Sequence, residues 1–174
     1  ILISSNLERL LFILSGYDAE KTAEYMRELS VDGKYSVDSD LYKKISDLFD
    51  AGYCDDNATK ATINEVFKKY DYLCDTHTAV AVNVYEQYTK RTCDDTPTVI
   101  ASTANPYKFS ASVLSAITYD IKSEDEFSMV EELFEKSKEP VPPQLATLKG
   151  KAPRFTRVSD KEDMAQVVFD MLGI

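Results

Sequence analysis

The sequence predicts a helix-rich α/β fold with a few short strands. Apolar residues recur at helical spacing through most of the 174 residues, and only a few short apolar runs are too brief for helices. The apolar share of 44% is enough for a core. Two to four short strands cannot form a wide sheet covered on both faces, so we expect the remaining strands to come from another part of a longer protein.

The first half of the chain predicts a strand followed by successive helices. The run 1–3 resembles a strand entered part-way. Ser5 with Glu8 is typical of a capping box, Gly16 suits a helix end, and Asp18 and Asn57 suit helix starts. We expect helices over 5–15, 18–29, 41–51, 57–70 and 76–89, and a short strand over 35–37.

The second half predicts a strand over 98–102, then a polar loop and a helix. Asn105 suits the N-cap and Pro106 the first helical position, where its missing N–H costs nothing. Ser123 with Glu126 forms a second capping box, and Ser159 with Glu162 a third. We expect helices over 106–117, 124–137 and 160–172, one helical turn over 145–148, and a strand over 155–158.

These elements suggest two regions. Residues 1–137 form the helix-rich α/β part, and residues 138–174 form a linker and a strand–helix extension that packs on the same domain. The formal charge of −10 argues against nucleic acid or an anionic membrane surface as a partner. Three cysteines, which leave at least one unpaired, favour a reducing compartment and a cytoplasmic location.

The strand-to-helix junction is the first candidate site. Thr103 follows the expected strand 98–102 and lies close to a helix start, which is where open α/β sheets bind ligands. Lys108 lies in the first turn of that helix, where a surface lysine is commoner than a reactive one. Cys74 and His77 have the spacing of half a metal site, but no second compact pair exists, so we predict no metal.

Four ordered segments resemble the threonine synthase family, in its bacterial and fungal branch. They contain the sequences ILISSNLERLLF (1–12), YLCDTHTAVA (72–81), ASTANPYKF (101–109) and PVPPQL (140–145). Asn105 stands where the family usually has histidine, and Thr76 where it has proline. The resemblance implies the C-terminal portion of a fold-type-II enzyme that uses pyridoxal 5′-phosphate (PLP) to convert O-phospho-L-homoserine and water to L-threonine and phosphate.

The resemblance also implies roles for individual residues. Thr103, with Ser102 as the less favoured candidate, would pair with the cofactor's ring nitrogen. Asn6 and Arg9 are candidate contacts of the substrate phosphate on other grounds, because helix starts favour anions and arginine pairs with phosphate, although a packed helix start with an exposed arginine is the commoner arrangement. The family's Schiff-base lysine motif and Gly-rich phosphate loop lie upstream and do not occur in this sequence. We therefore expect no catalytic residue in this chain, no turnover by the chain alone, and the missing N-terminal half as its partner.

Two other functions remain open. The first is a different PLP-dependent lyase or dehydratase of the same architecture, because the substrate contacts that distinguish such enzymes lie upstream. The second is a non-catalytic acidic helical module that binds another protein, for which we would expect an exposed apolar helix face and no ligand site at Thr103.

Overall fold

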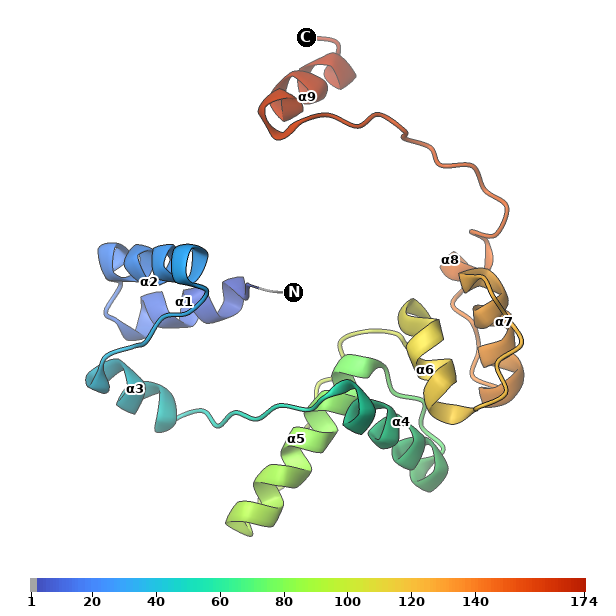
Figure 1. Cartoon of the computed structure of the whole chain (residues 1–174), viewed down its shortest axis with the longest axis horizontal. Coiled ribbons are helices and arrows are strands. Elements are labelled where there is room, and N and C mark those ends of the chain that lie inside the picture. The colour runs from blue at the N-terminus through green and yellow to red at the C-terminus, as the bar shows by residue number, and fades with distance from the viewer. Residues whose placement is uncertain (1–2) are drawn as a thin grey trace. The chain divides into compact units, whose positions relative to one another are not determined.

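The computed structural model describes residues 3–174, and these residues fold into helices joined by extended segments (Figure 1). The helices and their bounds are α1 Ser5–Leu14, α2 Ala19–Asp32, α3 Ser39–Ser46, α4 Asp56–Tyr70, α5 Thr76–Thr92, η1 Pro106–Phe109, α6 Ser110–Ile117, α7 Glu126–Ser137, α8 Pro143–Ala146, η2 Lys161–Asp163 and α9 Met164–Leu172. The helix-rich part of the prediction is therefore confirmed.

The expected strands are not found among residues 3–174. Segments 35–37, 98–102 and 155–158 have no strand assignment, and residues 1–2 of the expected first strand lie outside the described residues. A strand needs a neighbour to accept and donate its ladder hydrogen bonds. Val99 and Val158 are 94% and 92% exposed, so no other part of residues 3–174 covers these two segments.

All three predicted capping boxes are wrong by one or two residues. The predicted third cap, Ser159, is replaced by Asp160, whose side chain makes no capping hydrogen bond. The cap of α1 is Ser4, whose side chain accepts a hydrogen bond from the N–H of Leu7, rather than Ser5. The cap of α7 is Asp125, which accepts from the N–H groups of Phe127 and Ser128. Neighbouring Ser, Thr and Asp residues all satisfy this chemistry, so the pattern does not select among them.

The described chain divides into two compact units. The first comprises residues up to 58 together with 80–101, and the second comprises 59–79 together with 102–174. The predicted division between residues 137 and 138 falls within the second unit and stays a prediction.

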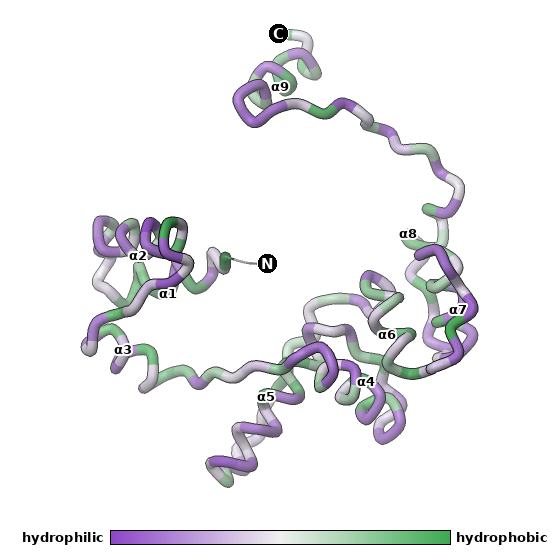
Figure 2. The backbone as a smooth tube through the Cα atoms, in the orientation of Figure 1, coloured by the Kyte–Doolittle hydropathy of each residue, from purple (hydrophilic) through white to green (hydrophobic). Residues whose placement is uncertain are grey.

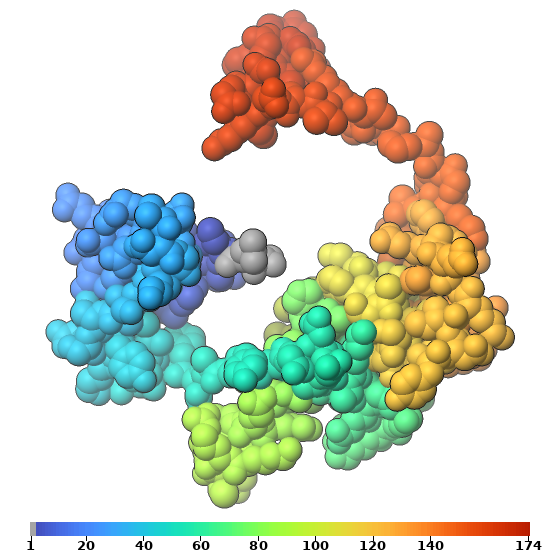
Figure 3. Space-filling view, viewed as in Figure 1, coloured from blue at the N-terminus to red at the C-terminus, as the bar shows by residue number. Residues whose placement is uncertain are grey.

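Helices α1, α2 and α3 share a small core in the first unit. Leu11, Tyr25 and Leu41 are its buried side chains. Figure 2 shows apolar residues recurring along each of these helices, and Figure 3 shows the three helices in contact. The core is small because each helix contributes one narrow apolar stripe.

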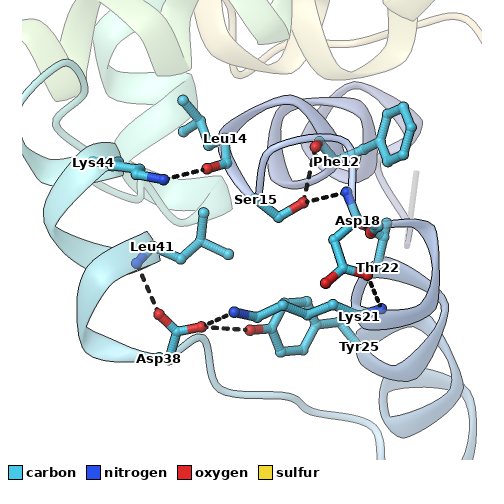
Figure 4. A network of polar contacts seen from close by, with 10 residues as sticks. All are labelled: Phe12, Leu14, Ser15, Asp18, Lys21, Thr22, Tyr25, Asp38, Leu41 and Lys44. Carbon is cyan, nitrogen blue, oxygen red and sulfur yellow. Dashed lines mark hydrogen bonds and ion pairs between the residues drawn. The ribbon is translucent and has the colours of Figure 1, made fainter.

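A polar network around Asp38 fastens α2 to α3 (Figure 4). One Asp38 oxygen caps α3 by accepting from the N–H of Leu41 at 2.9 Å. The other pairs with the ammonium of Lys21 and accepts from the hydroxyl of Tyr25 at 3.3 Å. The hydrogen bond from Lys21 is the largest influence, and the pKa of Asp38 falls from 3.8 to about 2.

This shift predicts a pH-dependent contribution of Asp38 to stability. A carboxyl whose pKa is lower in the folded state stabilises the fold above its unfolded pKa, and the contribution disappears as the pH falls through the folded pKa. We expect Asp38→Asn to speed amide exchange in α2 and α3 at pH 6, and the difference from wild type to shrink between about pH 4 and pH 2. A difference that stays constant over this range would contradict the prediction. Asp40→Asn, on the same helix, is the control.

The second unit contains the larger core. Its buried apolar residues come from α4, α5, α6, α7 and the segments between them, and are Ile63, Val66, Leu73, Cys74, Ala79, Tyr107, Val113, Leu114, Ala116 and Leu133. Helix α6 packs on α7. The amide of Asn64 on α4 donates to the carbonyl of Ala116 at 2.5 Å, and this bond ties α4 to the end of α6.

Candidate functional site

The loop 102–105 presents two neighbouring hydroxyl groups at the surface of the second unit. Ser102 and Thr103 are both exposed. Within residues 3–174, the Thr103 hydroxyl has no hydrogen-bond partner, whereas Ser102 is bonded on two sides. Thr103 follows an extended segment rather than the expected strand, but it precedes a helix start as predicted.

Asn105 closes this loop as the predicted N-cap. Its side-chain oxygen accepts from the N–H of Tyr107 at 3.0 Å, and Pro106 occupies the first helical position. Tyr107 is only 3% exposed and donates its hydroxyl to the carbonyl of Glu139 at 2.5 Å. The loop is therefore anchored at its C-terminal end by a capped and buried turn.

Because Asn105 caps η1, we expect its substitution to lower the stability of this helical turn. Asn105→Ala removes the only side-chain acceptor of η1 that the structure describes, and such substitutions cost about 1 kcal/mol. We expect amides of η1 to exchange about fivefold faster in native-state hydrogen exchange. Asn105→Asp keeps an acceptor and is the control. Equal exchange in the Ala and Asp variants would contradict the capping role.

Asp75 is the buried charge beside the loop. Its side chain is fully buried at the start of α5. One oxygen accepts from the N–H of His77 at 2.9 Å, and the other accepts from the Thr78 hydroxyl. Burial alone raises the pKa of Asp75, but the hydrogen bonds from the Thr78 hydroxyl and from the backbone and ring of His77 outweigh it, so the net pKa is lowered. Asp75 is therefore an ionised acceptor at neutral pH.

Thr78 connects this carboxylate to the loop. Its Oγ1 lies 3.1 Å from the Oγ of Ser102, and the Tyr72 hydroxyl lies 3.1 Å from the same Ser102 oxygen. Thr78 is 4% exposed and Tyr72 is 47% exposed. The network thus runs from a fully buried carboxylate to a solvent-facing loop.

Cys74 and His77 do not form a metal centre in the structure. No group of three potential metal ligands occurs among residues 3–174. Cys74 is buried, and burial raises the pKa of its thiol to about 11, so it stays protonated at neutral pH. The His77 ring contacts Asp75, with 3.1 Å between Nδ1 and the nearest carboxylate oxygen, and packs on Phe109 at a centroid distance of 5.0 Å. The His77 ring therefore makes contacts within the protein, with Asp75 and Phe109, rather than with a second metal-ligand pair.

The second predicted pair, Asn6 and Arg9, lies on α1 in the other compact unit. The guanidinium of Arg9 donates to the side-chain oxygen of Asn6 at 3.0 Å, and both residues are exposed. Arg9 also lines a surface pocket of about 440 Å³ with Glu8, whose carboxylate opposes anion binding. Their contact with a substrate phosphate stays a prediction.

Sequence reasoning missed the roles of Asp75 and Thr78. The signal was present as an Asp directly before a helix, because Asp is a favoured N-cap residue. The pattern does not reveal that Thr78 also reaches Ser102, because that contact joins residues 24 positions apart. Lys108 is exposed on η1, as expected for a surface lysine.

No helix among residues 3–174 has the length and hydropathy that crossing a bilayer requires. A comparison with protein families matches residues 78–168 to the family described as "Threonine synthase, C-terminal". This stretch covers more than half of the chain and includes the loop 102–105.

Individual relatives agree with this match. The chain is 36% identical to threonine synthase of Pseudomonas aeruginosa over 116 residues, which are 67% of this chain and 24% of the relative. It is 32% identical to human "Threonine synthase-like 1" over 117 residues, which are 67% of this chain and 15% of the relative. The chain thus spans about a quarter or less of the length of these relatives.

Solved structures extend the similarity to the fold. The yeast threonine synthase structure aligns with 99% of this chain and 35% of its own, at a TM-score of 0.70 and 26% identity. The PLP-bound threonine synthase of Brucella melitensis aligns with 74% of this chain and 27% of its own, at a TM-score of 0.58 and 32% identity. The family match, the relatives and the shared fold show that this chain belongs to the threonine synthase family, in its C-terminal region.

Proposed function

We propose that this chain is the C-terminal portion of a PLP-dependent threonine synthase, which converts O-phospho-L-homoserine and water to L-threonine and phosphate. The family match and the PLP in the related Brucella structure support this reaction. The observation that carries the proposal for this chain is the exposed Thr103 hydroxyl, held beside a capped helix start and without a protein partner among residues 3–174.

The loop fits the ring nitrogen of a pyridine cofactor. When bound, PLP withdraws electrons from the substrate and stabilises carbanions along its chain. A threonine hydroxyl is a poor base, so it donates one hydrogen bond to the ring nitrogen and leaves that nitrogen largely unprotonated. The hydroxyl of Thr103 is available for this bond, and Ser102 is the alternative donor on the same loop.

The rest of the active site comes from outside this chain. The family resemblance places the Schiff-base lysine and the phosphate-binding loop upstream, in the N-terminal half that is the partner of this chain. Asn6 and Arg9 are the proposed contacts of the substrate phosphate, because Arg matches phosphate geometry with paired donors. This chain therefore supplies one wall of the site and not its reactive lysine.

Absorbance and turnover measurements test the proposal. We expect the full-length protein to be yellow, to lose the colour on removal of PLP, and to release phosphate from O-phosphohomoserine with formation of threonine. The chain alone should form no threonine. Threonine formation by the chain alone would overturn the assignment of the lysine to the upstream half. A yellow full-length protein that acts on a different amino acid would instead support another PLP lyase or dehydratase.

A further inference from the structure

In the hydrogen bonds around Ser102, the buried carboxylate of Asp75 determines which hydroxyl donates and which accepts. An ionised carboxylate only accepts hydrogen bonds, and a threonine hydroxyl has one hydrogen to donate. The contact from Thr78 to Asp75 is charge-assisted and buried, so it takes precedence over a contact between two neutral hydroxyls. The Thr78 hydrogen therefore points at Asp75, and Thr78 Oγ1 meets its next neighbour as an acceptor.

This orientation determines what Ser102 does. The Oγ atoms of Ser102 and Thr78 lie 3.1 Å apart, and one of the two must donate. Because the Thr78 hydrogen is already used, Ser102 donates to Thr78. The Ser102 oxygen then accepts from the Tyr72 hydroxyl, which lies 3.1 Å away. The chain of donors runs from Tyr72 through Ser102 and Thr78 to Asp75, and Ser102 has no hydrogen left for a ligand.

We propose that Asp75 is a positioning residue which, through Thr78, commits the Ser102 hydroxyl to the protein and leaves Thr103 as the ligand-facing donor of the loop. Ser102 is then an anchor of the loop rather than a cofactor contact. The identity of the ligand as PLP rests on the function proposed above, whereas the direction of the network rests on Asp75, Thr78 and Ser102 alone.

The first test asks whether the Thr78–Ser102 hydrogen bond holds the loop 102–105 in place. It uses the full-length protein without cofactor. We expect Thr78→Val to speed hydrogen exchange at the amides of residues 102–105, and Ser102→Ala to speed it at least as much, because Ser102→Ala also removes the contact with Tyr72. The double variant should add nothing to Ser102→Ala, because Ser102→Ala already removes the bond to Thr78. Thr78→Ser keeps the hydroxyl and should restore wild-type exchange. Thr76→Val, on the same helical turn, is the matched control. Unchanged exchange in Thr78→Val would overturn the proposal.

The second test separates the two loop hydroxyls by titration with PLP. We expect Thr103→Val to raise the dissociation constant at least about fivefold more than Ser102→Ala does, as the loss of one hydrogen bond requires. Thr103→Val should leave the exchange of the loop amides close to wild type. A larger effect of Ser102→Ala than of Thr103→Val would overturn the proposed direction of the network. If the wild-type protein binds no PLP, the proposed function fails, and the exchange comparison still decides whether Thr78 holds Ser102.

Discussion

Thr103→Val in the full-length protein is expected to lower kcat/KM for threonine formation by about 5- to 150-fold. Valine keeps the shape of threonine and removes the hydroxyl, so the ring nitrogen of the cofactor loses its donor. An unsatisfied buried acceptor costs about 1–3 kcal/mol, which corresponds to this range. The change acts on the cofactor rather than on the fold, because Thr103 is exposed and makes no hydrogen bond within residues 3–174.

Steady-state kinetics with cofactor titration measure this effect. Thr103→Ser retains a hydroxyl and should remain near wild type, which separates loss of the donor from a disturbance of the loop. The visible absorbance of the cofactor should also change in the valine variant, because the partner of the ring nitrogen tunes its electronic state. Wild-type affinity, spectrum and activity in Thr103→Val would remove Thr103 from the site.

Leu11→Ala is expected to destabilise the α1–α3 core by about 2–5 kcal/mol. Leu11 is 1% exposed and packs with Tyr25 and Leu41, so truncation removes buried methyl groups and leaves a cavity that helix packing closes only in part. The effect is large because Leu11 is one of only three side chains that form the buried centre of this core among residues 3–174.

Native-state hydrogen exchange of the full-length protein measures this loss helix by helix. Amides that exchange through opening of α1–α3 should exchange at least about 30-fold faster in Leu11→Ala. Leu7→Ala on the same helix is the matched control, since Leu7 is 43% exposed and its truncation creates no cavity. A similar acceleration in both variants would show that helix propensity, rather than core packing, controls the opening.

Local chemistry made much of the helical structure predictable. Asp18 and Asn105 were expected as N-caps, and both side chains accept a backbone N–H two or three residues later. Gly33 ends α2 in the left-handed conformation, at φ +71°, where glycine is the residue type expected at a helix end. These features depend on residues within one helical turn, so the order of residue types along the chain is enough to locate them.

The strands were not predictable in the same way. The segment 98–102 has the short apolar pattern of a buried strand, but a strand exists only where a second segment completes its hydrogen bonds. Within residues 3–174 no such neighbour occurs, and Val99 stays exposed. The pattern describes what the segment needs, and residues 3–174 supply no partner strand for it.

The amino-acid sequence located the helix starts to within a few residues, and it was sufficient for the family and for the choice of the 102–105 loop as the candidate site, because each depends on residues close together in the chain. Only the tertiary structure shows that Asp75 is fully buried and that Thr78 reaches Ser102. That contact supplies a physical reason to prefer Thr103 over Ser102, a preference that otherwise rested on the family resemblance alone. The physical reason is that a hydroxyl has a single hydrogen, and its direction is decided by the strongest acceptor that folding brings within reach.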